Sequence, residues 1–171
     1  MNNDQKVNQK KNIILGFCFC LLYILAVSYF LYMNLSNSDK SQEQSSVVTD
    51  TVIDVITTFD EDWNYQYDNV HSVVRKLFGH YGYSLMMGVL GFLTLYFFKI
   101  RLKNIFIINL ILGLFISSIA ELFQMIPEGR GPSYVDVLIN YSGYISGLLL
   151  IFLIIKISIY IVNKKRVEYA R

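Results

Sequence analysis

The stretch ELFQMIPEGRGPSYVDVLINYSGYISG, residues 121–147, joins two strongly apolar segments and decides how the chain folds. Its polar side chains include those of Glu121, Gln124, Arg130, Asp136 and Asn140. A carboxylate at the centre of a bilayer costs roughly 2.5 to 3.5 kcal/mol on insertion scales, so ionisable groups beside apolar helices indicate a functional site. The Pro and Gly residues between the two segments predict a tight reversal of the chain over residues 127–135.

Hydrophobic residues make up 54% of the 171-residue chain and come in blocks. About 20 apolar residues cross a hydrocarbon core of roughly 30 Å. We therefore predict an all-α membrane protein built as a four-transmembrane-helix bundle. The four spans are expected at residues 13–33, 77–98, 105–126 and 136–162. The second span is the weakest, because its apolar block covers only residues 83–98.

Cations are concentrated in the N-terminal segment 1–12, in the connection near residue 100 and in the tail 163–171. Because short cytoplasmic segments carry excess Lys and Arg, these three regions are expected inside the cell, with both termini cytoplasmic. The segments 34–76 and 127–135 are then extracellular, and the first of them is rich in Asp and Glu. The net charge of +2 thus averages a basic inner face and an acidic outer loop, and no nucleic-acid partner is expected.

The outer loop divides into two parts. Residues 34–50 are polar and are expected to form a flexible connector. Apolar residues near helical spacing then predict a short interfacial helix over 51–62, followed by Trp63 and two tyrosines suited to the headgroup level. An ordinary loop packed on the bundle fits the same residues equally well.

Small and polar residues recur at helical spacing along one face of each of the last three predicted spans. In lipid, helices associate through close backbone approach at small residues and through a few interhelical hydrogen bonds. These faces should therefore meet inside the bundle, with a Gly-x-x-x-Gly packing seam on the last span. The glycines expected to pack between helices are Gly88, Gly91, Gly143 and Gly147.

A lone carboxylate at the predicted depth of Glu121 should either take up a proton and become neutral or pair with a cation. The candidate cations are Arg130, His80 and Lys76. One interpretation is a pin between helices that fixes the bundle. The other is an acid, a base or a proton carrier that serves a lipid-linked or wall-derived ligand, with Glu121, His80 and Asp136 as catalytic candidates. The candidate binding residues are Arg130, Gln124, Asn140, Lys76 and Arg75.

No metal site or cofactor is expected. His71 and His80 are nine residues apart, and no cysteine lies near them in predicted depth. Cys18 and Cys20 fall inside the first apolar block, where a thiol behaves as a small apolar group.

The acid, the amide three residues later, the Gly-Arg-Gly-Pro turn and the Asp-x-x-x-Asn pattern before paired glycines resemble the VanZ-like family of bacterial membrane proteins. The likeness covers about residues 70–155, the last three predicted spans, and includes the hydrophobic layout of the first span. A looser match is VRKLFGHYGY, residues 74–83, which supplies Arg75, Lys76 and His80. Two departures stand out: the spacing from Lys76 to His80 is one residue longer than the commoner form, and Ser133 stands where an acidic residue is often found.

The resemblance implies a protein of the bacterial plasma membrane, in a Gram-positive setting, that lowers susceptibility to teicoplanin and lipid-tailed glycopeptides. It favours a non-enzymatic protein that changes the access of such drugs, or of wall precursors, at the outer surface of the membrane. An intramembrane enzyme acting on a lipid-linked substrate and a small proton-linked transporter or regulatory subunit are the alternatives. The expected partners are the lipid bilayer and a lipid-linked wall precursor or glycopeptide, and the oligomeric state is left open.

Overall fold

The computed structural model of the chain describes residues 3–35, 38–59, 66–127 and 131–169. The helices in chain order are α1 (Asn3–Leu35), α2 (Ser38–Phe59), α3 (Tyr67–Val74), a π-helix η1 (Arg75–Gly82), α4 (Tyr83–Phe97), α5 (Leu102–Phe123) and α6 (Tyr134–Tyr169). No strand occurs within these residues, which confirms the prediction of an all-α fold.

Three helices are long and apolar enough to cross a membrane, over Gln5–Leu35, Leu102–Phe123 and Tyr134–Lys165. They coincide with three of the four predicted spans. In the most apolar window of the first and third, only 11% of residues are buried inside the protein, and most of their Leu and Ile side chains are exposed. A helix that is hydrophobic all round needs a protein core or a bilayer around it, and here lipid is the surrounding that fits.

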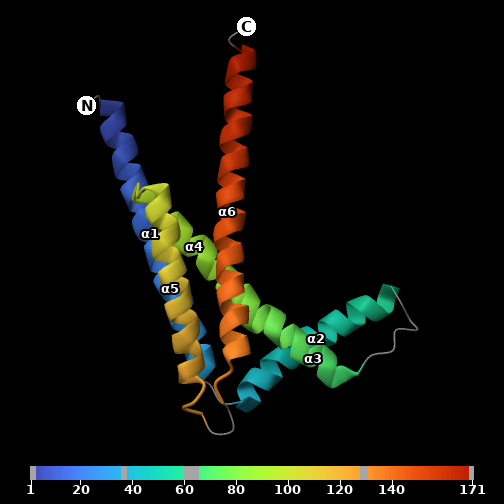
Figure 1. Cartoon of the computed structure of the whole chain (residues 1–171). Helices are drawn as coiled ribbons and strands as arrows, with labels where there is room; N and C mark the ends of the chain where they lie inside the picture. The colour runs from blue at the N-terminus through green and yellow to red at the C-terminus, as the bar shows by residue number, and fades with distance from the viewer. Residues whose placement is uncertain (1–2, 36–37, 60–65, 128–130, 170–171) are drawn as a thin grey trace.

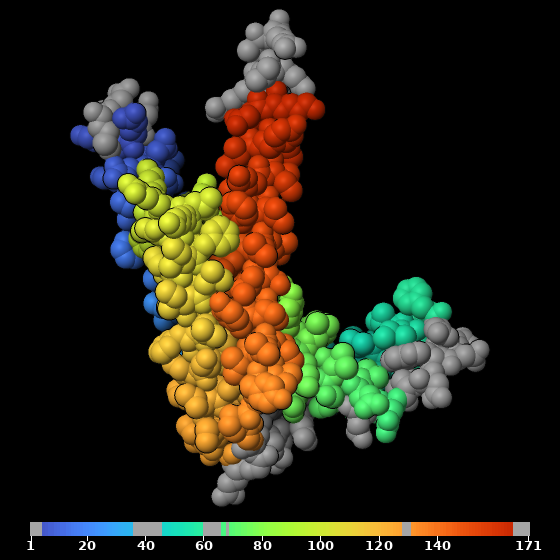
Figure 2. Space-filling view, viewed as in Figure 1, coloured from blue at the N-terminus to red at the C-terminus, as the bar shows by residue number. Residues whose placement is uncertain are grey.

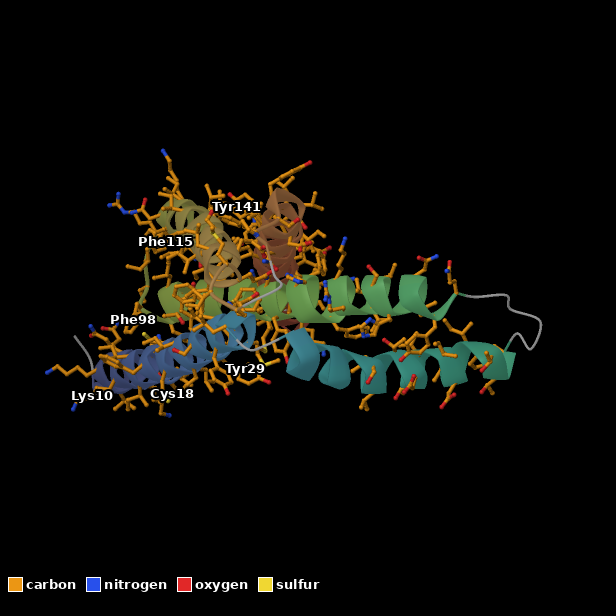
Figure 3. The ribbon with its side chains drawn as sticks, turned by 90° about the horizontal axis from the view of Figure 1, so that it is seen from below. Lys10, Cys18, Tyr29, Phe98, Phe115 and Tyr141 are labelled. Carbon is orange, nitrogen blue, oxygen red and sulfur yellow. The ribbon has the colours of Figure 1, made fainter. Side chains whose placement is uncertain are left out.

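The region predicted as the second span, 77–98, has a different form. Its α-helical part, α4, has only 15 residues and follows α3 and η1 without a break, so that one long rod runs from Tyr67 to Phe97. The rod crosses the other helices obliquely (Figure 1). Seen from below, α1 and α2 lie on one side of it and α5 and α6 on the other (Figure 3). The described residues therefore contain three helices that are both long and apolar enough to cross a membrane, with the shorter α4 packed among them.

Glycines allow α4 and α6 to approach at backbone distance. A methyl group added at Gly88 of α4 would collide with the Tyr144 carbonyl oxygen of α6, and one added at Gly147 of α6 would collide with the Leu85 carbonyl oxygen of α4. At Gly143 it would lie 2.5 Å from the Tyr81 carbonyl oxygen. The Gly-x-x-x-Gly pair of α6 thus lies directly against η1 and α4.

A helix replaces the connector predicted over residues 34–50, since α2 begins at Ser38 and not near residue 51. The physical reason is composition: residues 38–59 contain no Gly or Pro, and Gln and Glu favour helix. α2 packs against α3, and the two project to one side of the other helices (Figure 1). The end of the predicted interfacial helix, residues 60–62, and Trp63 lie outside the described residues.

The helices define two ends of the molecule. The N-terminus, the α4–α5 turn and the C-terminus all lie in the upper half of Figure 1, and we call this the basic end. The C-terminus of α1 and the α5–α6 connection lie at the opposite end, which we call the loop end (Figure 1).

Candidate functional site

Glu121 lies in the last turn of α5 at the loop end, with only 2% of its surface exposed. Its Oε1 accepts hydrogen bonds from Gln124 Nε2 at 3.1 Å and from Asn140 Nδ2 at 3.5 Å. Its Oε2 accepts one from the backbone N–H of Ser133 at 3.2 Å, in the connection that leads into α6. The carboxylate therefore joins α5, the connection that follows it and α6.

Asn140 links Glu121 to the π-helix. Its Oδ1 lies 3.2 Å from His80 Nδ1 and accepts a longer bond, 3.5 Å, from the Ser84 hydroxyl. Because an amide oxygen only accepts, His80 carries hydrogen on Nδ1 in this contact. The same Nδ1 is 4.0 Å from Glu121 Oε1, so the imidazole and the carboxylate lie next to each other and both contact one buried amide.

Gln124, the C-cap residue of α5, brings the end of α1 into this cluster. Its Nε2 donates to Asn34 Oδ1 at 2.6 Å as well as to Glu121, which uses both of its hydrogens. Asn34 Nδ2 in turn donates to the Phe30 carbonyl one turn earlier in α1. We call Glu121, Gln124, Asn34, Asn140, His80, Ser84 and the Ser133 amide the Glu121 network. It joins α1, the rod, α5 and α6.

The π-helix places His80 in this network. Helices with i→i+5 bonding are rare, and they occur mostly as single-turn bulges, frequently at functional sites. Here η1 covers Arg75–Gly82, so both Lys76 and His80 lie on it. His80 is buried, whereas Lys76 on the same segment is half-buried and has no hydrogen bond or ion pair among the described residues.

The side chains of Asp136 and Arg75 form no hydrogen bond or ion pair with the Glu121 network among the described residues. The Asp136 N–H donates to the Ser133 hydroxyl at 3.3 Å, which caps the start of α6. Asp136 Oδ1 and Arg75 Nε are buried without a hydrogen-bond partner among the described residues. Arg130 lies outside the residues that the structure describes.

A second polar cluster, missed from the sequence, lies one helical turn deeper on α6. The Tyr144 hydroxyl donates to Asn109 Oδ1 at 3.0 Å and lies 2.9 Å from the Tyr23 hydroxyl, which joins α6 to α5 and α1. Gly113 leaves room for the Tyr144 ring, and Gly91 leaves room for its hydroxyl. Of these residues only Asn109 and the glycines were visible as part of the polar and small stripes. A tyrosine inside an apolar block gives no signal of its own.

We expect Tyr144→Phe to lower the free energy of unfolding by about 1 kcal/mol, because it leaves a buried amide oxygen without its donor. The thermal unfolding midpoint of the purified protein in detergent should fall by about 2 to 4 °C. Tyr141→Phe is the matched control, since the Tyr141 hydroxyl on the same helix has no partner among the described residues. Equal midpoints for the two variants would contradict a structural role for the Tyr144 hydroxyl.

The Glu121 network contains the Glu121 carboxylate and the His80 imidazole, which are bridged by the Asn140 amide. Such a group can hold a proton, or it can hold helices together. Among the described residues, no three His, Cys, Asp or Glu side chains gather in an arrangement that could hold a metal ion.

Apolar helices of crossing length with outward-facing side chains, and a buried polar network near their ends, define a helical membrane protein. The family model of VanZ/LLP1 matches residues 19–156, and the chain belongs to this family. The match confirms the resemblance seen in the sequence and extends it from about residue 70 back into α1. No curated protein and no solved structure matches the chain.

Proposed function

We propose that this protein is a multi-pass protein of the bacterial plasma membrane whose loop end faces outward. The basic end then lies in the cytoplasm, as the excess of Lys and Arg there favours. The chain would cross four times, with α4 and the π-helix before it as the fourth crossing. The Glu121 network would then lie in the outer half of the bilayer.

We further propose that the protein lowers susceptibility to teicoplanin and lipid-tailed glycopeptides, in a Gram-positive cell, without catalysing a reaction. It would do so by changing how the drug or the wall precursor reaches the outer surface. The observation that carries the non-enzymatic proposal is the closure of the Glu121 network. Glu121 and His80 are 2% and 8% exposed, and the carboxylate is held by Gln124, Asn140 and the Ser133 amide. A substrate would have to displace these donors.

The test is the susceptibility of a Gram-positive strain that lacks this protein, with and without the wild-type chain restored. We expect the restored strain to tolerate several-fold more teicoplanin than the strain without the protein, with a smaller change for a glycopeptide that has no acyl tail. Equal susceptibility of the two strains would remove the resistance role.

One observation favours a second candidate, an intramembrane acid–base enzyme or a proton-linked carrier. The imidazole of His80 and the carboxylate of Glu121 share Asn140, an arrangement in which a proton could pass between two titratable groups. Wild-type protein in proteoliposomes would distinguish the candidates. Chemical change of a labelled lipid-linked wall precursor would favour the enzyme, proton uptake would favour the carrier, and the non-enzymatic proposal expects neither.

A further inference from the structure

We propose that a groove near the basic end binds an anionic phospholipid of the adjoining leaflet. The groove has a volume of about 190 Å³ and lies between the end of α4, the start of α5 and α6. Apart from Lys156 and Tyr96, its lining residues are all Phe, Leu or Ile, and they include Phe92, Ile100, Ile105 and Phe152. The shape and the apolar wall suit part of an acyl chain.

Lys156 supplies the positive charge by which the groove prefers an anionic lipid to a neutral one. It is the only ionisable Lys, Arg, Asp or Glu between Asp136 and Lys164, and it lies about 12 Å from Lys164 along the helix. Its ammonium lies 5.4 Å from the centre of the Phe152 ring, one turn back toward the middle of α6. The side chain therefore leans toward the groove, away from the basic end to which a long cationic side chain would usually extend.

Lys156 also has no acidic partner in the part of the chain that the structure describes. Between described residues, the one cation–carboxylate contact within 4.0 Å is that of His80 with Glu121, far from this groove. A cation among apolar side chains needs a counter-charge, and basic pockets between membrane helices bind anionic headgroups. A lipid phosphate is the anion that the bilayer itself supplies.

Further cations stand beside the groove on the α4–α5 turn. Arg101 lies between two groove residues, Ile100 and Leu102. Lys99 lines a neighbouring hollow of about 400 Å³ that shares Tyr96 and Ile100 with the groove. Figure 2 shows the upper half of α6 standing apart from the N-terminal half of α1. Lys156 on α6 and two cations of the α4–α5 turn therefore come from two elements beside this groove, a charge that suits an anionic headgroup.

The test is native mass spectrometry of the purified full-length protein, titrated with phosphatidylglycerol or phosphatidylcholine of the same acyl chains. We expect the wild-type protein to prefer phosphatidylglycerol by about five-fold or more, the effect of one or two cations near an anionic group. Lys156→Gln should remove most of that preference, and Lys156→Arg should keep it. Thermal unfolding of each variant checks that the fold is intact.

Lys164→Gln is the matched control, because Lys164 is a cation on the same helix that does not line the groove. It should retain the wild-type preference. Equal affinity of the wild-type protein for the two lipids would overturn the proposal. So would an equal loss of preference in Lys156→Gln and Lys164→Gln, which would indicate attraction by overall charge.

Discussion

Replacing Gly147 with valine is expected to destabilise the protein by about 3 kcal/mol, at the upper end of the range for overpacked cores. The added side chain would meet the Leu85 carbonyl oxygen of α4, and a backbone atom cannot rotate away as a side chain can. α4 and α6 would have to separate along the contact that holds the rod in place. The unfolding midpoint should fall by about 6 to 12 °C, with a matching loss of protein from the membrane fraction.

Two further variants test the same contact between α4 and α6. Gly88→Val should have a similar effect, because Gly88 occupies the reciprocal position against the Tyr144 carbonyl oxygen. Gly131→Ala is the control, since an added methyl group there would meet nothing within 4 Å. Wild-type stability of Gly147→Val would show that α4 and α6 do not lie at backbone distance.

The second large effect concerns Glu121. Among the described residues, Glu121→Ala removes the acceptor of the hydrogen bonds from Gln124, Asn140 and Ser133 and leaves these donors to find new partners. We expect a loss of about 2 to 3 kcal/mol. Glu121→Gln keeps an oxygen for two of the three donors and should cost about 1 kcal/mol. Unfolding of the purified variants in detergent measures both values.

Ser118→Ala is the control for this pair. The Ser118 hydroxyl, one turn earlier on α5, donates only to the Leu114 carbonyl of its own helix among the described residues. Its removal should change stability by less than Glu121→Gln does. If Glu121→Ala were as stable as Ser118→Ala, the carboxylate would not hold the helices together.

Much of the fold followed from hydropathy. Three uncharged blocks predicted three helices of crossing length, because each segment is apolar over enough residues to fill a bilayer. The remaining apolar block is shorter than a bilayer is thick. In the structure it forms α4, which packs against α1, α5 and α6 and follows directly after the π-helix η1. A rule that counts apolar residues cannot show that a short helix lies inside a bundle at an oblique angle.

The candidate site was predictable only in part. Glu121, Gln124 and Asn140 stood out because they are polar residues at helical spacing beside apolar blocks, and the structure brings them together with His80. Asn34 was placed in the outer loop, and its bond to Gln124 joins residues 90 positions apart. The bond between Tyr23 and Tyr144 spans 121 positions. Such pairs depend on how the helices pack, which a single sequence does not encode as a local pattern.

We propose that Glu121 acts by joining helices and not by carrying a proton. The most direct test is teicoplanin susceptibility per unit of membrane-inserted protein, measured for wild type, Glu121→Gln and Glu121→Ala in the strain that lacks the protein. We predict that resistance follows abundance, with Glu121→Gln close to wild type and Glu121→Ala lower in both. A Glu121→Gln protein present at wild-type abundance but without effect on susceptibility would contradict the claim.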